Sequence, residues 1–377
     1  MNGYYSKRLQ KNSKRYSELQ ENIRLYFEHS IEKEQKQKSY LEHHNFINYK
    51  SGEVLNINYD FEKKYKEYSK VTEQRALTIQ ELAKRNENMC SVFITLTLPS
   101  AYHPFKSIKT LKGRLYVEDN PDFMFDSLKE AVSYGYKELN RIYQTFYKRL
   151  KNYVKSDLYY IKAIENHVTM IPHCHLVLYF PLEHLDRVKG LFKRVVEHFK
   201  LNRTDIEEVS FKEDINYASK YLLKYIIKDL NNSSDIYKAR VLDGWKRFHK
   251  IRVLTSSQLP LNVMVYKQIY KAISFIPENK INSKSDDKIS VLKEKINEEV
   301  QSLNIPLYLY FQDNFSIQKT TIVQGNRRVS RQGKRDSIIK VKLTTEKKAK
   351  YYKIREFEVS YKNKKIYTKQ QFTKIQI

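Results

Sequence analysis

The stretch from Pro172 to Phe180 constrains the fold of this chain more than any other. It reads Pro-His-Cys-His-Leu-Val-Leu-Tyr-Phe, and every residue after the second histidine is apolar or aromatic. Such a run, opened by a proline, predicts a buried strand that begins just after a turn. Side chains alternate along a strand, so His173 and His175 share one face. Two imidazoles are costly to bury without a partner, and either a metal ion or backbone carbonyls could supply one.

The segments around this strand predict an α+β fold. Their order is strand, helix, hairpin, helix, strand and helix, with expected boundaries at 90–99, 123–153, 159–180, 181–200, 206–211 and 214–229. Helices mixed with antiparallel strands in this order favour a central, mostly antiparallel sheet with helices packed on it.

Changes in composition along the chain predict three domains. Residues 1–88 are charged and mostly helical by pattern, which indicates an N-terminal extension. The mixed segments fill 89–278, and a polar stretch near Asn279 marks the next boundary. In the module at 279–377, the segments 307–317 and 355–377 alternate like strands. From residue 319 onward the chain has 18 Lys and Arg against 4 Asp and Glu, so this β-rich module either contacts phosphates or presents a solvated basic surface.

The charge of the whole chain favours a polyanionic partner. Its formal net charge is +27, which points first to nucleic acid and second to an anionic membrane surface. We expect no membrane association, because no apolar run is long enough to cross a bilayer or to serve as a signal peptide. The two cysteines, Cys90 and Cys174, lie in or beside expected strands, which suits free buried thiols in the cytoplasm.

One carboxylate is placed to join the two histidines. Glu165 ends the strand before the His-x-His strand, and the short loop between them lets it lie beside the imidazoles. Two imidazoles and a carboxylate can bind a divalent ion and leave positions open for water or substrate oxygens. Mg²⁺ or Mn²⁺ would suit action on phosphate, although catalytic zinc uses the same ligands. His167 is either a turn residue or a support for one of the ligands.

A tyrosine-rich helix follows later in the chain. Tyr217, Tyr221 and Tyr225 recur at four-residue spacing, with Lys220 and Lys224 on the adjoining edge. A lysine ammonium stabilises a phenolate, so a tyrosine and a lysine beside a metal site can cleave a phosphodiester by transesterification. The alternative is an aromatic stripe that packs in the core.

Three motifs, taken in order, resemble those of the HUH rolling-circle replication initiators. The motifs are Phe93–Thr97, Pro172–His175 and Tyr217–Tyr221. Their amino-acid sequences are most similar to those of the branch that includes phage replication gene A proteins and related plasmid and filamentous-phage initiators. Further similarities to that branch lie at Pro99–Pro104, at Glu165–His167 and in the basic segment Gly244–Arg252. The resemblance spans roughly residues 75–270.

The resemblance implies a fold, a mechanism and roles for particular residues. The sheet is expected to be of RNA-recognition-like type, with the His-x-His strand at its centre and the tyrosine helix over it. Tyr217 would attack the scissile phosphate with help from Lys220, which leaves a 5′-phosphotyrosine and a free 3′-OH, and Tyr221 would act in the next round. Because Tyr225 extends the pattern, a register of Tyr221 with Lys224 is the alternative. Lys224, Trp245 and Arg247 are expected to contact DNA, although Trp245 could equally be a core residue.

The function expected from these observations is the nicking and rejoining of one strand at a replication origin. No phosphate-binding loop of the Gly-x-x-x-x-Gly-Lys type occurs, so a host helicase and a host DNA polymerase are implied partners, with single-stranded origin DNA as substrate. An HUH transposase or relaxase of a mobile element is an alternative. A basic DNA-binding replication regulator without catalysis is another.

Overall fold

The computed structural model describes most of the N-terminal two thirds of the chain and several strands near its C-terminus. The described residues are 13–47, 54–55, 57–109, 115–154, 157–201, 204–209, 236–259, 261, 266, 269–270, 308, 311, 315–324, 337–342, 352–361, 364–371 and 373–376. Contacts between Cα atoms group the chain into two compact units. The first contains residues 1–33 and 61–258, and the second contains 34–60 and 259–377.

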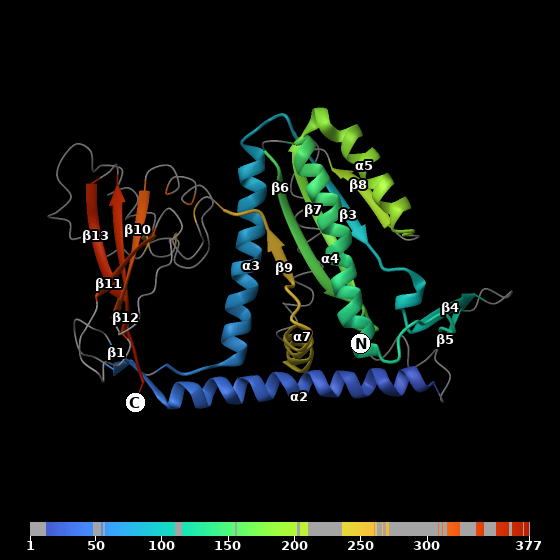
Figure 1. The fold of residues 1–377 in the computed structure, drawn as a ribbon, viewed down its shortest axis with the longest axis horizontal. Coiled ribbons are helices and arrows are strands. Elements are labelled where there is room, and N and C mark those ends of the chain that lie inside the picture. Colours follow the sequence, from blue (N-terminus) through green and yellow to red (C-terminus); the bar gives the residue numbers. More distant parts are fainter. Residues whose placement is uncertain are drawn as a thin grey trace. The chain divides into compact units, whose positions relative to one another are not determined.

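A five-stranded antiparallel sheet forms the centre of the first unit (Figure 1). Its strand order is β8-β3-β7-β6-β9, so the His-x-His strand lies in the middle. The strands are β3 (Met89–Leu96), β6 (Tyr159–Asn166), β7 (Pro172–Pro181), β8 (Thr204–Val209) and β9 (Leu254–Ser256). A separate hairpin joins β4 (Phe105–Lys109) to β5 (Leu115–Asp119). The helices are α2 (Lys14–Glu42, which continues past this unit), α3 (Phe61–Lys84), α4 (Leu128–Tyr153), α5 (Leu185–His198) and α7 (Ile236–Phe248), with single 3-10 turns η1 (Ser100–Tyr102) and η2 (Leu182–His184).

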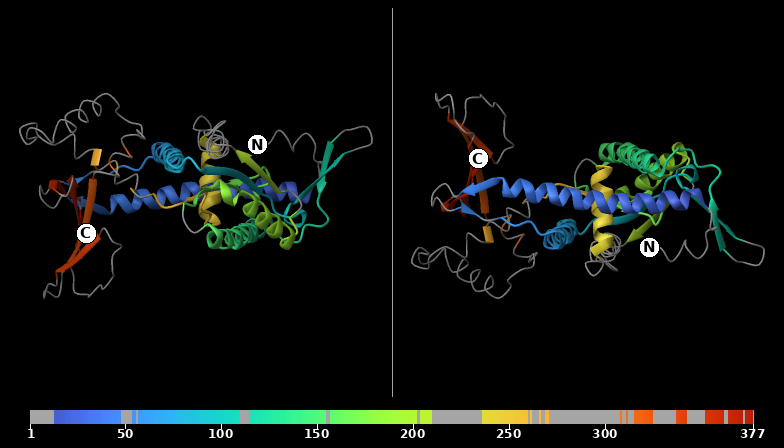
Figure 2. Two further views of the ribbon diagram at one scale, coloured as in Figure 1. Left: turned by 90° about the horizontal axis from the view of Figure 1, so that it is seen from above. Right: turned by 90° about the horizontal axis from the view of Figure 1, so that it is seen from below.

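Alternation along the strands separates the two faces of this sheet. On one face, β3 and β7 contribute buried apolar side chains to one core with α4 and α5. Figure 2 shows these two helices beside the sheet. Those strand residues are Val92, Ile94, Leu96, Leu176, Leu178 and Phe180. The opposite face carries Phe93, Thr95 and His175, because successive side chains of a strand point to opposite sides. The strong β propensity and the tight packing of both faces therefore hold the histidines in a fixed register.

Helix α2 is built into the first unit by a close crossing with α7. Leu19, Ile23 and Tyr26 are buried at helical spacing along α2. A Cβ atom placed on Gly244 of α7 would collide with the backbone carbonyl of Tyr26. Only glycine allows the two helix backbones to approach this closely, which explains its presence inside a helix that it would otherwise weaken.

A buried histidine joins the same two helices to α4. Tyr26 Oη lies 2.7 Å from His249 Nε2, and Ser133 Oγ of α4 lies 2.8 Å from His249 Nδ1. Burial, together with the nearby positive charge of Lys129, lowers the pKa of His249 to about 4. The imidazole is therefore neutral at pH 7 and links three helices by hydrogen bonds.

The second unit contains two further sheets. Strands β1 (His44–Ile47), β2 (Val54–Leu55) and β14 (Thr373–Gln376) form one of them, in the order β14-β1-β2. The other has the order β11-β10-β12-β13 and is formed by β10 (Phe315–Gln324), β11 (Ser337–Lys342), β12 (Tyr352–Tyr361) and β13 (Lys364–Gln371). Its β10–β11 pair is parallel and its other pairs are antiparallel.

The structure confirms the α+β class and a central antiparallel sheet with packed helices. One local expectation is corrected. Tyr308 and Phe311 are helical, and the strand expected at 307–317 begins only at Phe315. Both residues are fully buried, and a spacing of three places two side chains on one face of a helix but on opposite faces of a strand. The described part of the N-terminal segment is mostly helical, as expected, and also contributes β1 and β2. The domain boundaries at 88 and 278 concern independent folding and stay predictions.

Two other expectations can be compared with the described residues. Cys90 and Cys174 are buried free thiols, as expected, and burial raises the pKa of each to about 12. In the described part of the chain, no helix has both the length and the apolar content that a membrane crossing needs.

Replacing Gly244 with alanine tests the crossing of α2 and α7. The added methyl group would push the two backbones apart, so Gly244→Ala should lower the free energy of unfolding by about 1–3 kcal/mol or more. Urea denaturation measures this change. The matched control is Gly190→Ala in α5, where no atom lies within 4 Å of the added Cβ. That variant should be neutral or slightly stabilising, and equal effects of the two substitutions would contradict the crossing.

The pH dependence of stability tests the buried histidine. Because the pKa of His249 is about 4 in the folded chain and about 6.5 when unfolded, the unfolded state binds more protons between these values. Stability therefore falls as pH decreases through that window. Between pH 7 and pH 4, the wild type should lose roughly 3 kcal/mol more of its free energy of unfolding than His249→Gln. Parallel losses in urea titrations would show that His249 is not buried in neutral form.

Candidate active site

Glu165 and His175 meet on the face of the sheet opposite α4 and α5. Glu165 Oε2 lies 2.9 Å from His175 Nε2. The contact arises from the hairpin register, in which Glu165 pairs with His173, and Ala163, two positions back on the same face, pairs with His175. The predicted neighbourhood of the carboxylate and the histidines is therefore present in the structure.

Strand β3 holds the His175 ring from its other side. Thr95 pairs with His175 in the β3–β7 register, and its Oγ1 lies 3.3 Å from His175 Nδ1. The Phe93 ring stacks on the imidazole with 5.7 Å between centroids and an interplanar angle of 21°. Only 5% of His175 is exposed to solvent. Both ring nitrogens thus have a polar neighbour, and the ring orientation is set from two strands.

His173 packs among two further histidines. The His167 ring, in the turn between β6 and β7, stacks on it with 4.9 Å between centroids and an interplanar angle of 12°. The His103 ring, which follows η1, stands edge-on to it at 5.8 Å. His103 also lies 6.3 Å from His167. Three imidazoles from three separate segments therefore gather at the end of the His-x-His strand.

Two of these imidazoles are held in their neutral forms. Burial lowers the pKa of His173 well below its usual range, and the neighbouring histidines lower it further. Burial also lowers the pKa of His167, against the opposing effect of the Glu165 carboxylate. The Nε2 atom of His173 is buried and has no hydrogen-bond partner among the described residues. A neutral imidazole with an unshared nitrogen lone pair is the form that binds a metal ion.

Glu165, His173 and His175 carry the kinds of donor atom that a divalent ion binds, and part of their arrangement suits such an ion. Donor atoms about 2.1 Å from one octahedral ion stand about 3 Å apart when adjacent, which is close to the 2.9 Å between Glu165 Oε2 and His175 Nε2. His173, in contrast, stacks on His167. Within the described residues, no three His, Cys, Asp or Glu side chains are grouped so that they could hold a metal ion. Glu165 and His175, two of the three side chains predicted as ligands, are thus in contact, and the third is turned toward His167.

The remaining predicted site residues have different outcomes. Tyr217, Lys220, Tyr221 and Lys224 lie outside the described residues. Arg247 is 43% exposed in its side chain and donates through Nε to Asp243 at 2.7 Å.

Trp245 does not have the exposed position that base stacking requires. Only 1% of this residue is exposed, and its indole lies in the same core as α4 and β7. Its Nε1 donates to the carbonyl of Met170 at 3.0 Å. The expected DNA contact of Trp245 is therefore corrected in favour of the core position, because the apolar ring is buried and its polar group is satisfied inside the protein.

Two residues join the site that were not among its predicted members. Thr95 lies inside the Phe93–Thr97 motif, and its register opposite His175 places its hydroxyl beside the imidazole. His103 belongs to the Pro-Ser-x-x-His-Pro tail at 99–104, whose similarity to the initiator motif was the only sequence signal. Its position beside His173 depends on the loop held by Asn120, whose Nδ2 donates to the carbonyls of Ser100 and His103.

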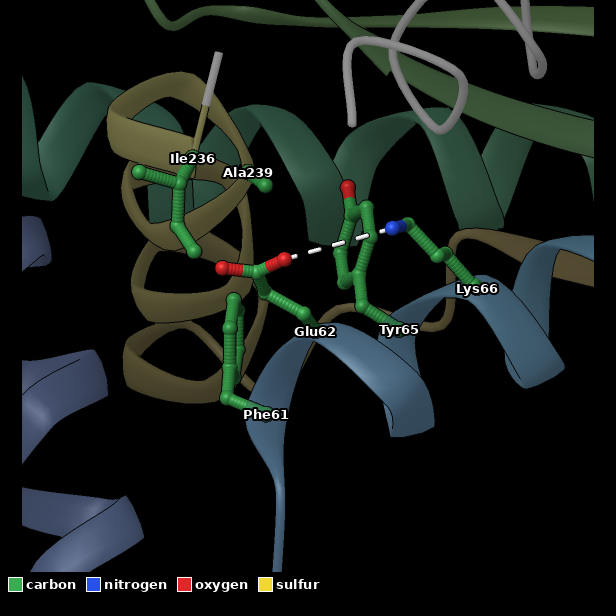
Figure 3. A pocket seen from close by; sticks show the side chains of 6 residues that line it. All are labelled: Phe61, Glu62, Tyr65, Lys66, Ile236 and Ala239. Carbon is green, nitrogen blue, oxygen red and sulfur yellow. Dashed lines mark ion pairs between the residues drawn. The ribbon is translucent and has the colours of Figure 1, made fainter. Parts of the chain in front are cut away.

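A small pocket lies elsewhere in this unit, between α3 and the start of α7 (Figure 3). Lys66 and Glu62 form a 3.9 Å ion pair at it. Its lining residues are Phe61, Glu62, Tyr65, Lys66, Ile236 and Ala239. None of these residues is a predicted catalytic or metal-binding residue, so we assign the pocket no part in the chemistry.

Comparison with known proteins links the chain to replication. It is similar to a protein named "Replication protein" from Haemophilus phage HP1 (strain HP1c1), with 30% identity over 159 residues. The match covers 41% of this chain and 18% of the phage protein. No family model matches the sequence, and no solved structure matches the fold. The similarity therefore supports a replication protein in the broad sense.

Proposed function

We propose that this chain initiates rolling-circle DNA replication by nicking one strand at an origin and later rejoining it. The observation that carries this proposal is the contact of Glu165 with His175, beside His173, on the central strand of an antiparallel sheet. Similarity to a phage replication protein supports the same biological role. The net charge of +27 suits a DNA substrate.

The proposed reaction is a transesterification on a phosphodiester. The Tyr217 oxygen attacks the scissile phosphorus and loses its proton, the bond from phosphorus to O3′ breaks, and the leaving oxygen takes up a proton. The products are a 5′-phosphotyrosine and a free 3′-OH. Lys220 would stabilise the phenolate. Tyr221 would repeat the same step in the next round, so that the displaced strand is closed and released.

Glu165, His173 and His175 would hold a Mg²⁺ or Mn²⁺ ion, provided that the His173 ring turns from His167 toward Glu165, its partner across the hairpin. When bound, such an ion would polarise the scissile phosphate and stabilise the charge that develops on it. Thr95 and Phe93 would keep the His175 ring in the ligating orientation. Arg247 would contact the phosphate backbone of the DNA through the exposed part of its side chain.

The proposed partners follow from what the sequence provides and lacks. Single-stranded DNA at the origin is the substrate. Because the sequence has no phosphate-binding loop, unwinding would be carried out by a host helicase, and a host DNA polymerase would extend the 3′-OH. The reaction would take place in the host cytoplasm.

A covalent adduct is the direct test of the proposed nuclease. The chain should be incubated with Mn²⁺ and overlapping single-stranded oligonucleotides that cover its gene and the flanking DNA, each labelled at the 3′ end. Because the enzyme retains the 5′ phosphate of the downstream fragment, the label should appear in a band that survives SDS. We expect Tyr217→Phe and Tyr221→Phe together to abolish the band, and Tyr225→Phe, four residues further along the sequence, to retain it.

Two outcomes would contradict this proposal. If no strand gives an adduct while the chain still binds the DNA, a replication regulator without catalysis becomes the better interpretation. If the double variant still forms the adduct, the nucleophile lies elsewhere.

Removing a metal ligand tests the histidine site separately. His175→Ala should reduce adduct formation by at least about 100-fold, because the metal contributes several kcal/mol to stabilising the transition state. It should also weaken Mn²⁺ binding measured by electron paramagnetic resonance, and leave salt-sensitive DNA binding largely unchanged. His198→Ala, at an exposed position of α5, is the control. Unchanged Mn²⁺ affinity in His175→Ala would exclude this residue as a ligand.

A further inference from the structure

The indole of Trp245 connects α7 to the turn that carries the site. Trp245 is the only tryptophan in the chain. It is buried, and its Nε1–H donates to the carbonyl of Met170, 75 residues earlier in the sequence, at 3.0 Å. Met170 lies in the turn between β6 and β7, between Glu165 on one side and His173 on the other.

This turn has a conformation that needs support from its surroundings. Met170 has a φ of 66°, in the left-handed region that residues other than glycine rarely adopt. Within the turn, the Met170 N–H donates to the carbonyl of His167 at 2.7 Å, and the His167 N–H donates to the carbonyl of Ile171 at 3.0 Å. The hydrogen bond that Trp245 donates to Met170 comes from α7, which lies outside the turn. A strained residue persists where neighbouring groups determine its position.

The segment of α7 that carries Trp245 is held in place by contacts with two other helices. Trp245 is the next residue after Gly244, where the backbone of α7 crosses that of α2. Four residues further on, His249 is hydrogen-bonded to both Tyr26 and Ser133. The indole is therefore presented by a segment fixed on α2 and α4, and its N–H has one defined direction.

We propose that Trp245 is a positioning residue of the active site. Its hydrogen bond to Met170 fixes the β6–β7 turn, and through the turn it sets the places of His167 and His173 relative to Glu165. This inference rests on the proposed function, since it assigns Trp245 a part in assembling the proposed metal site. This positioning role takes the place of the direct contact between the Trp245 indole and DNA that was expected from the sequence.

An isosteric replacement separates positioning from simple core packing. β-(3-Benzothienyl)alanine at position 245 keeps the shape of the indole and has sulfur in place of the N–H group. The full chain carrying it should fold, which circular dichroism and urea denaturation would verify. We expect its Mn²⁺ affinity, measured by electron paramagnetic resonance, to fall by about 10- to 100-fold, as is typical when a group that orients a metal ligand is lost. The Mn²⁺ concentration for half-maximal adduct formation should rise by a similar factor.

Two further variants complete the test. Trp245→Phe removes the N–H by ordinary mutagenesis and should show the same change in Mn²⁺ dependence together with a larger loss of stability. Ile142→Val, in the core on α4, lowers stability without removing a hydrogen bond of the turn and should leave Mn²⁺ affinity as in the wild type.

The outcomes distinguish this inference from the proposed function. If the wild type forms no adduct but loses Mn²⁺ affinity on replacement of Trp245, the nuclease proposal fails and the positioning role stands. If the wild type forms the adduct and the benzothienyl variant keeps the wild-type Mn²⁺ dependence, the positioning role is wrong. A wild type that binds no Mn²⁺ overturns both.

Discussion

The pairing of β7 with β3 and β6 is the interaction on which the rest of the first unit depends. Strand β7 is central and buried on both faces, so a polar group on it is costly unless a neighbouring strand supplies a partner. His175 finds Thr95 on one neighbour and Glu165 on the other. A shift of register by one residue would place Cys174 on the site face and turn both histidines against α4. The apolar core thus selects the register, and the register assembles the polar site.

The sequence predicted the parts of this arrangement that depend on local pattern. The strand at 172–181 followed from its apolar run, and the place of Glu165 followed from counting residues around a short loop. The environment of Trp245 could not be predicted in this way, because its hydrogen-bond acceptor lies 75 residues away. The pairing of β1 with β14 has no local signal either, since residues 44–47 and 373–376 are far apart in the sequence. Local periodicity predicts an element and its faces, whereas long-range partners emerge only when the chain folds.

Not every positive charge of this chain is available to an external partner, because some pair with a buried carboxylate inside the protein. Asp243 is buried and accepts a hydrogen bond from Ser30 Oγ at 3.1 Å. It also pairs with Lys246 at 2.8 Å and with Arg247 at 2.7 Å. A buried carboxylate requires such partners, so these two cations stabilise α7 in addition to any contact with DNA. Net charge alone therefore overstates the positive surface that a polyanion would meet in this part of the chain.

The crossing of α2 and α7 has a consequence for how the chain is made. Tyr26 and His249 are 223 residues apart, and ribosomes add roughly 5–20 residues per second. Helix α2 is therefore synthesised some tens of seconds before α7, and during that time its apolar stripe lacks this partner. Contacts so distant in sequence also slow folding, because a long loop must close before they form. The first unit can reach its complete form only late in translation, and the newly made N-terminal helix must stay soluble until then.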